Sequence, residues 1–311
     1  MKLMKFISGL KVSVALVLGI FLSAPSWALQ PHETFVHYGT PSVEKLAEWS
    51  RLPGTRNYLI ELSEAPGSYL ESIAAVRNGD KIQVHVTNFP TRAQTGLWKK
   101  LADQGVELIT FGIGIPNDDQ IQVLNDIGFS RINLTLTDFL TEDQAKHLLA
   151  LKCSVSLSYA LNRYPLFLEK PAFLVLPSSV PVLYATDYWP TYDHMDIMNM
   201  IPQMQKIHIT NILPTEKEQP YLHGIKNLSE IIVDLDSDPA PGSWHFFHGI
   251  NIRWSAKDHV PSAAALQDFA STAQDGGTRK IVIDQDQALT PSERARLESS
   301  PFPVEWIHSA N

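Results

Sequence analysis

The sequence predicts an α/β fold built from repeated β-α units with parallel strands. Short stretches of alternating apolar and polar residues recur about every 24–25 residues, and helical segments separate them. Short connections between a strand and the following helix place successive strands parallel to one another. A second marker has the same period, because Asn or Asp ends many of the predicted strands, at Asn88, Asp138, Asn162, Asp187, Asn211 and Asp236.

The stretch from Arg131 to Cys153 shows one unit clearly. Ile132, Leu134 and Leu136 alternate with polar residues, which is typical of a strand with one buried face. Thr141 offers a hydroxyl that can cap the helix that follows, and the acidic residues after it favour the positive end of the helix dipole. We therefore expect a strand, a tight loop and a short helix.

The same reading extends along the chain. Predicted strands begin near residues 35, 58, 82, 106, 131, 155, 182, 207, 231, 250, 281 and 304. Predicted helices in the first half cover residues 41–49, 69–76, 96–101 and 118–127. Gly105 and Gly128 each follow a predicted helix, as is common at helix ends.

The first 28 residues are predicted to be a secretory signal peptide. Three lysines precede the apolar run from Val12 to Leu22, which is too short to span a bilayer, and small residues lead to a cleavage point after Ala28. An uncleaved membrane anchor is the alternative. Residues 29–311 are expected to form a single repetitive domain, exported to the periplasm or secreted, with a proline- and aromatic-rich insertion at about 163–179.

Charge and cysteine content narrow the possible partners. The full chain has a formal net charge of −8, and removal of the three leader lysines makes the remainder more acidic still. An acidic exported protein is a poor candidate for binding nucleic acid. Cys153 is the only cysteine, so the chain forms no intramolecular disulfide and no cysteine-based zinc site. We expect no metal and no cofactor, since no established motif for either is present.

Two architectures satisfy the repeat. An open solenoid accepts any number of units, whereas a closed barrel of the (β/α)8 type needs about eight, so extra units would have to be accommodated. Many predicted strands carry a polar face, as Asn133 and Thr135 do, and strands buried on both sides usually read as continuous apolar runs. This pattern favours an open solenoid with one wet side of the sheet, and a barrel with extra units is the alternative.

Two units resemble leucine-rich repeats. Residues 129–134 and 204–209 resemble the core pattern of that family, in which apolar residues occupy positions one, four and six. The resemblance implies a horseshoe whose parallel strands line a concave surface that binds ligands.

Candidate site residues fall into two groups. Polar residues on predicted strands and an aromatic loop are expected to bind a ligand: His85, Asn133, Thr135, Asp187, Trp189, His208, Asn251 and Arg253. If the protein is instead a barrel hydrolase, the acid and base candidates are Asp187, Asp193, His194, His208 and Asp234. Asp234, Asp236 and Asp238 alternate as in calcium loops, but the glycine and the closing acidic residue of an EF-hand are missing.

These observations favour a binding or scaffold protein over an enzyme. We expect a soluble exported protein that presents a polar sheet face to a protein or glycan ligand. The alternative is an exported barrel hydrolase acting on a glycan or a phosphoester. The sequence leaves open the ligand, the oligomeric state and whether any catalysis occurs.

Overall fold

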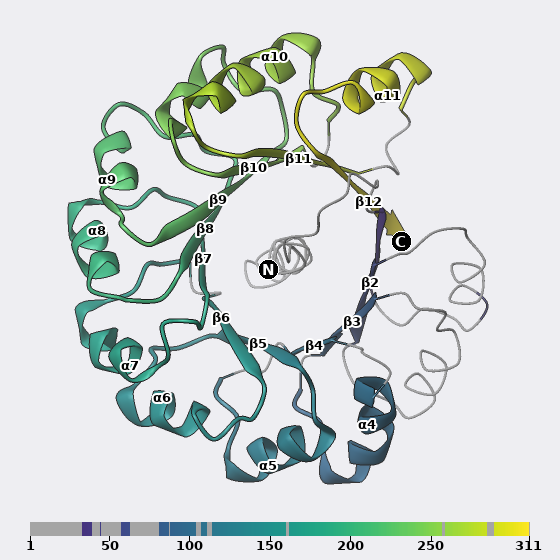
Figure 1. Ribbon diagram of the computed structural model, residues 1–311, viewed down its shortest axis with the longest axis vertical. Helices are drawn as coiled ribbons and strands as arrows, with labels where there is room; N and C mark the ends of the chain where they lie inside the picture. The colour runs from purple at the N-terminus through teal and green to yellow at the C-terminus, as the bar shows by residue number, and fades with distance from the viewer. Residues whose placement is uncertain are drawn as a thin grey trace, which may run out of the picture.

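The computed structural model describes residues 33–38, 44, 57–62, 81–86, 88–103, 107–110, 114–159, 162–256, 259–284 and 289–310. Within these ranges the strands form one parallel sheet, and each strand pairs with its neighbours in chain order. The first strand also pairs with the last, so the sheet closes into a ring of twelve strands (Figure 1).

The strands lie where the repeat predicts them. Their bounds are β1 Glu33–Tyr38, β2 Asn57–Leu62, β3 Lys81–Val86, β4 Glu107–Thr110, β5 Arg131–Leu136, β6 Ser154–Tyr159, β7 Val182–Thr186, β8 Gln205–Thr210, β9 Leu228–Leu235, β10 Ile252–Ala256, β11 Arg279–Asp284 and β12 Val304–Ala310. The α/β class, with repeated β-α units and parallel strands, is confirmed.

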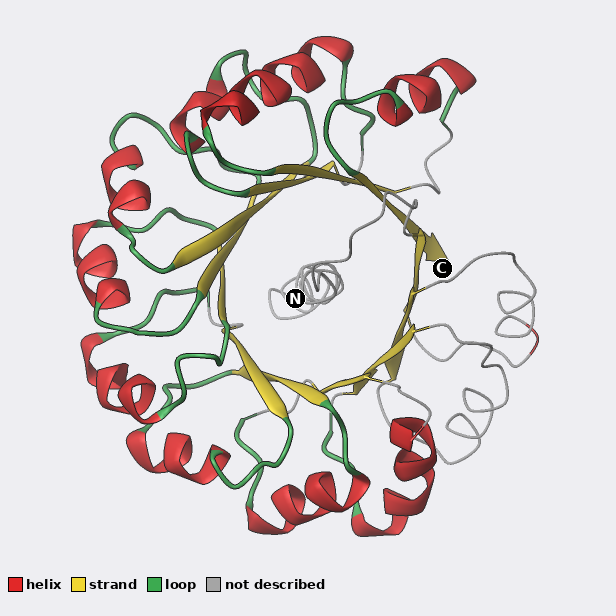
Figure 2. Cartoon of the chain, in the orientation of Figure 1, coloured by secondary structure: helices red, strands yellow, loops and turns green. Residues whose placement is uncertain are grey.

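The helices cover the outside of the ring (Figure 2). They are α4 Thr95–Asp103, α5 Asp118–Ile127, α6 Glu142–Leu148, α7 Lys170–Val175, α8 Tyr192–Asn199, α9 Gln219–Gly224, α10 Ala263–Ser271 and α11 Pro291–Glu298. In the described part of the chain, 3-10 turns accompany them at η1 Arg92–Gln94, η2 Phe167–Glu169, η3 Ser243–Phe247 and η4 Thr272–Asp275. The helices predicted at 41–49 and 69–76 fall outside the described residues, apart from Glu44.

Closure of the sheet corrects the preference for an open solenoid. β1 and β12 are in register over five residue pairs, from Glu33 opposite Trp306 to His37 opposite Ala310. The arrangement is therefore the alternative that the sequence left open, a barrel with extra units. It also differs from the open horseshoe that the resemblance to leucine-rich repeats implies.

The polar faces of the strands explain why the sequence favoured an open sheet. Asn133 and Thr135 were expected on a wet surface, but they are only 1% and 5% exposed. They lie on the inner face of the ring, opposite the strand face that packs under the helices. Polar residues in a strand sequence show that a face is not packed against helices, and they do not show that water covers it.

Local sequence signals begin and end the helices. Asn117 caps α5 and Thr141 caps α6, each accepting a hydrogen bond from the backbone N–H three residues on. In each case a glutamine side chain bonds back to the capping residue, which completes a capping box. Gly128 ends α5 with φ of 79°, a left-handed conformation that glycine adopts without steric cost.

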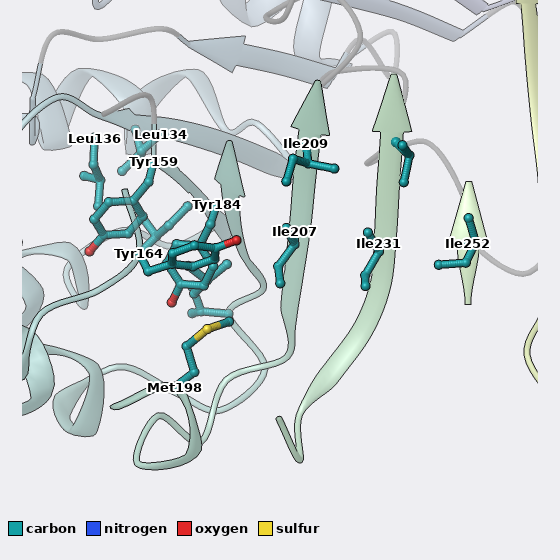
Figure 3. Close-up of a cluster of buried hydrophobic side chains, with 14 of the residues drawn as sticks. Leu134, Leu136, Tyr159, Tyr164, Tyr184, Met198, Ile207, Ile209, Ile231 and Ile252 are labelled. Atoms are coloured by element: carbon teal, nitrogen blue, oxygen red, sulfur yellow. The ribbon is translucent and has the colours of Figure 1, made fainter. Parts of the chain in front are cut away.

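The hydrophobic core lies between the outer face of the sheet and the helices. Outward-facing residues of successive strands form its inner layer, for example Leu134, Tyr159, Tyr184, Ile207 and Ile231 (Figure 3). The core continues around the described arc of the ring, since each unit packs on the next. Each β-α unit thus buries its apolar face only together with its neighbours, as in other repeat proteins.

The insertion predicted at 163–179 holds η2 and α7, and a buried carboxylate fixes it. Glu169 is fully buried and accepts hydrogen bonds from Arg163, from the Tyr159 hydroxyl and from the backbone N–H groups of Leu140 and Leu166. Burial opposes ionisation of Glu169, but its hydrogen bonds and the Arg163 charge lower its pKa overall. The bonds that Glu169 accepts from Tyr159 and Leu140 tie the insertion to the units before it.

Asparagines near the ends of helices and in a turn before a strand join neighbouring units. Asn125 bonds the backbone at Ala150 and Lys152, and Asn199 bonds the backbone at Gly224 and Lys226. Asn251 makes the corresponding contacts with Ser229 and Thr278. These bonds satisfy backbone groups in the turns of the neighbouring units.

None of the helices within the described ranges has the length and apolar character needed to cross a membrane.

Candidate binding site on the inner face of the barrel

The inner faces of β8 to β12 carry a set of ionisable side chains, which we call the charged arc. Its members are Lys206, His208, Glu230, Asp234, Arg253, Lys280 and Glu305. They alternate along the strands with residues of the core, such as Ile207, Val233 and Trp254, and so point the other way. Seven ionisable residues on five adjacent strands are brought together by the sheet, although they span about a hundred residues of sequence.

The centre of the charged arc is a carboxylate shared by two cations. Arg253 donates a hydrogen bond through Nη2 to Oε2 of Glu305, and Lys280 Nζ lies 2.7 Å from the same oxygen. Arg253 and Glu305 are buried, while the Lys280 side chain is 30% exposed. Arg253 reaches Glu305 across the intervening strand β11, so the contact links three strands.

The surroundings shift the pKa values of two of these groups. Burial would raise the pKa of Glu305, but the charges of Arg253 and Lys280 outweigh it, and the pKa lies below its usual range. Burial, together with the Arg253 charge, lowers the pKa of Lys280 despite the attraction of Glu305. Glu305 is therefore an ionised counter-ion near neutral pH and is poorly suited to donate a proton.

Two further pairs lie on β8 and β9. Lys206 Nζ is 2.7 Å from Oε2 of Glu230, and both side chains are largely buried. His208 Nε2 is 3.0 Å from Oδ2 of Asp234, and both of these side chains are buried almost completely. The His208 approach is close but is not aligned as a hydrogen bond, and both ring nitrogens and both Asp234 oxygens have no hydrogen-bond partner among the described residues.

The inner faces of β5 and β6 carry no charge apart from Arg131 at the strand start, and we call their polar residues Asn133, Thr135, Ser156 and Ser158 the neutral arc. Oδ1 of Asn133 accepts hydrogen bonds from both serine hydroxyls, at 3.0 Å from Ser156 and 3.2 Å from Ser158. On the next strand, β7, the inner residues are Leu183 and Ala185. The ring thus changes from neutral and short side chains to charged and long ones between β7 and β8.

The structure brings several of the predicted site residues together. Asn133, Thr135, His208 and Arg253 share the inner face, as does Asp234, which was predicted as a catalytic alternative. His85 lies on β3, and its side chain is outside the described set. Asn251 lies just before β10, where its side chain bonds the backbone of the neighbouring units rather than entering the charged arc.

The aromatic cluster after β7 lies at the rim and packs locally. Trp189 is buried against Phe247, with ring centroids 5.7 Å apart. His194 stacks on Tyr164 at 4.9 Å, and its Nδ1 accepts a hydrogen bond from the Thr191 backbone at the start of α8. Partial burial lowers the pKa of His194, so it is mostly neutral near pH 7.

The predicted acids of this cluster do not meet a common partner. Asp193 is exposed in the first turn of α8, and Asp187 is exposed with its backbone N–H bonded to Asn162. The geometry of the rim is accounted for by packing and helix capping.

The three alternating aspartates diverge. Asp234 faces His208 on the inner face, Asp236 bonds Asn211 at the strand end, and Asp238 accepts from the Ser262 backbone. Within the described ranges, no group of three or more His, Cys, Asp or Glu residues could hold a metal ion.

Lys206, Glu230, Lys280 and Glu305 were missed by the sequence reading. Each lies in a strand next to large apolar residues, as Lys280 does beside Ile281 and Glu305 does beside Trp306. A charge at an alternate position of a strand that is otherwise buried is the signal that could have found them. Their mutual contacts could not be found in this way, because they depend on how the strands are ordered and closed.

No family model matches this sequence, and a search of curated proteins finds no relative. The chemistry of the inner face must therefore be inferred from its own residues.

Proposed function

We propose that this protein is an exported binding protein that takes a hydroxyl-rich, glycan-type ligand on the inner face of its barrel. The observation that carries the proposal is the His208–Asp234 pair. A carboxylate and an imidazole lie side by side on adjacent strands, both buried, and neither has a hydrogen-bond partner among the described residues.

Buried polar groups without partners are costly, so proteins keep them where another molecule completes the bonding. The two oxygens of Asp234 can accept from a pair of hydroxyls, and His208 can donate to or accept from a third. The neutral arc adds amide and hydroxyl groups that suit the same chemistry. Neutral polyols such as sugars present this pattern of donors and acceptors.

The closed sheet favours a glycan over a folded protein as the ligand. Helices cover the outside of the described arc, and the strands present their polar faces only toward the inside (Figure 2). Barrel diameter increases with strand number, and barrels wider than eight strands commonly enclose ligands. An oligosaccharide end fits such a setting, whereas a large flat protein surface does not.

Export is supported by the predicted signal peptide. The expected cleavage after Ala28 precedes Glu33, the first residue of β1, so it would leave every described strand in place. Glycans of the cell envelope and its surroundings are available to a protein in that compartment.

The test is calorimetric binding of a panel of soluble oligosaccharides to the exported, purified protein. We expect Asp234→Ala to weaken binding at least about tenfold, because a hydrogen bond to a charged group contributes about 1.5–3 kcal/mol. Asp187→Ala is the matched control at the rim and should bind as the wild type does. Thermal unfolding of both variants separates loss of the site from loss of the fold.

Two outcomes would contradict the proposal. One is that no oligosaccharide binds to the folded protein. The other is that Asp234→Ala and Asp187→Ala bind equally well, which would place the site away from the inner face.

The second candidate is the exported hydrolase, and the same pair favours it. A buried imidazole 3.0 Å from a carboxylate can move protons in acid–base catalysis. Its weakness is the order of the groups: Ser255 is the register partner of Asp234, not of His208, so the histidine does not lie between the hydroxyl and the acid as in a serine hydrolase.

A screen with glycan and phosphoester substrates tests this second candidate. Turnover that is lost in Asp234→Asn and retained in Asp187→Ala would replace the binding function with a hydrolytic one. Absence of turnover for ligands that bind would leave the protein as a binding protein.

A further inference from the structure

We infer that the ligand of this inner-face site carries an acidic group, which Arg253 and Lys280 receive. The inference rests on the proposed glycan-binding function and names the class of glycan, a sugar with an anionic substituent. It comes from the two cations around Glu305, the unused donors of Arg253 and the spacing of these groups from the His208–Asp234 pair.

The charges around Glu305 do not balance locally, although the whole arc, with Asp234 included, carries as many carboxylates as Lys and Arg side chains. Lys206 and Glu230 are paired with each other at 2.7 Å. Arg253 and Lys280 share a single carboxylate, that of Glu305, and both contact the same oxygen of it. Two cations held around one anion in a buried setting attract a second anion, since a buried excess charge is costly unless it is paired.

Arg253 also has N–H donors beyond the one that bonds Glu305. A guanidinium presents five N–H donors in a planar fork that matches carboxylate and phosphate groups. The bond to Glu305 uses Nη2, while Nε is buried without a hydrogen-bond partner among the described residues. The Arg253 residue is only 3% exposed, so its remaining donors face the interior of the protein rather than bulk water. The partly exposed Lys280 provides a cation that an entering anion can reach.

The distance between the His208–Asp234 pair and Arg253 suits one small molecule. Strand register places His208, Ile232, Arg253 and Lys280 at one level on four neighbouring strands. Neighbouring strands are about 4.8 Å apart, so the backbones at His208 and Arg253 are separated by roughly 10 Å. A sugar with hydroxyls at one end and an acidic group at the other can contact Asp234 and Arg253 at once. The acidic group can be a uronic acid carboxylate or a phosphate ester, and the two share the chemistry of a compact anion.

The experiment compares three probes by calorimetry on the exported, purified protein. They are a glucuronic acid-containing disaccharide, the same disaccharide with its carboxyl group reduced to an alcohol, and a sugar phosphate. We expect the acidic probes to bind at least about tenfold more tightly than the reduced disaccharide, with a preference that decreases as salt increases. The tighter of the two acidic probes identifies the kind of anion.

Variants of Lys280 locate the effect. Lys280→Met should remove most of the preference for the acidic disaccharide over the reduced one, and its thermal unfolding, compared with that of the wild type, shows whether the variant is folded. Lys280→Arg should retain the preference. Lys226→Met removes an exposed lysine in the turn before β9 and should change neither affinity.

The outcomes separate this inference from the proposed function. Equal binding of the acidic and reduced disaccharides would overturn the inference and leave a neutral glycan site. A preference that survives Lys280→Met would overturn the assignment to this cluster. Failure of all three probes and of the wider oligosaccharide panel would overturn the proposed function together with the inference.

Discussion

The neutral arc and the charged arc occupy the same inner face of one sheet, but they solve the problem of burying polar groups differently. In the neutral arc one acceptor, Oδ1 of Asn133, satisfies two serine hydroxyls on the next strand. In the charged arc Glu305 is matched by two cations, while Asp234 and His208 approach each other without an aligned hydrogen bond. The two serines of the neutral arc thus share a partner within the protein, whereas the Thr135 hydroxyl and the His208–Asp234 pair have no hydrogen-bond partner among the described residues.

Under the proposed function, the contrast between the two serines and the His208–Asp234 pair is one between polar groups kept for stability and polar groups kept for a ligand. Side chains kept for stability find partners within the protein, as Glu169 does in the insertion with Arg163, Tyr159 and backbone N–H groups. Side chains kept for a ligand leave bonding capacity that the ligand completes, at some cost to stability. Removing the central group of each arc tests this difference between the two arcs.

The largest expected effect is that of Glu305→Leu in the charged arc. Without this carboxylate, Arg253 and Lys280 are left near each other in a buried setting, and removing one partner of a buried ion pair typically costs about 3–5 kcal/mol of stability. Urea denaturation measures the change in free energy of unfolding. Glu298→Gln is the matched control, because Glu298 pairs with Arg294 on the exposed face of α11 and should cost less than about 1 kcal/mol. Equal effects of the two variants would show that Glu305 is not a buried counter-ion.

A smaller loss is expected for Asn133→Ala in the neutral arc. The substitution leaves two buried hydroxyls without their shared acceptor, and an unsatisfied buried group costs about 1–3 kcal/mol. The same denaturation experiment measures it. Ser154→Ala, at the exposed start of β6, is the control and should stay within about 0.5 kcal/mol of the wild type. If Asn133→Ala costs more than Glu305→Leu, the ranking of the two arcs is wrong.

The smallest effect is a dependence of stability on pH that arises in the charged arc. The pKa of Glu305 is lower in the folded protein than its unfolded value of about 4.3, so its ionisation stabilises the fold above that pH. This contribution is lost as pH falls through the lowered pKa, at about 1.4 kcal/mol for each unit of depression. Wild type and Glu305→Gln should therefore converge in unfolding free energy between pH 5 and the acid limit. Parallel curves over that range would show that Glu305 titrates alike in both states.

The sequence located the strands well because their signal is local. Alternation within β5 and the Asn or Asp at the strand ends repeat with the period of the unit, and each depends only on residues next to one another. Thr141, the capping residue of α6, acts over three positions and was predicted for the same reason. The prediction of which strand face is polar was also correct, as Asn133 and Thr135 show.

The site was recovered only in part. His208, Arg253 and Asp234 were recognisable as polar residues on strands, but nothing in the segments of Lys280 and Glu305 shows that they form a cluster with Arg253. Asp187, Trp189 and His194 of the rim cluster were predicted as site residues from their residue types. The structure gives its aromatic members packing and capping partners instead.

The sequence by itself determined the β-α unit, its length and the parallel direction of its strands, because these follow from periodicity, caps and short loops. Only the tertiary structure decided that the sheet closes, since closure depends on the pairing of β1 with β12 at opposite ends of the described chain. Closure turned a face that looked wet into an inner wall. It also brought Arg253, Lys280 and Glu305 into one cluster, because contacts across a ring depend on the number and order of strands and not on any single segment.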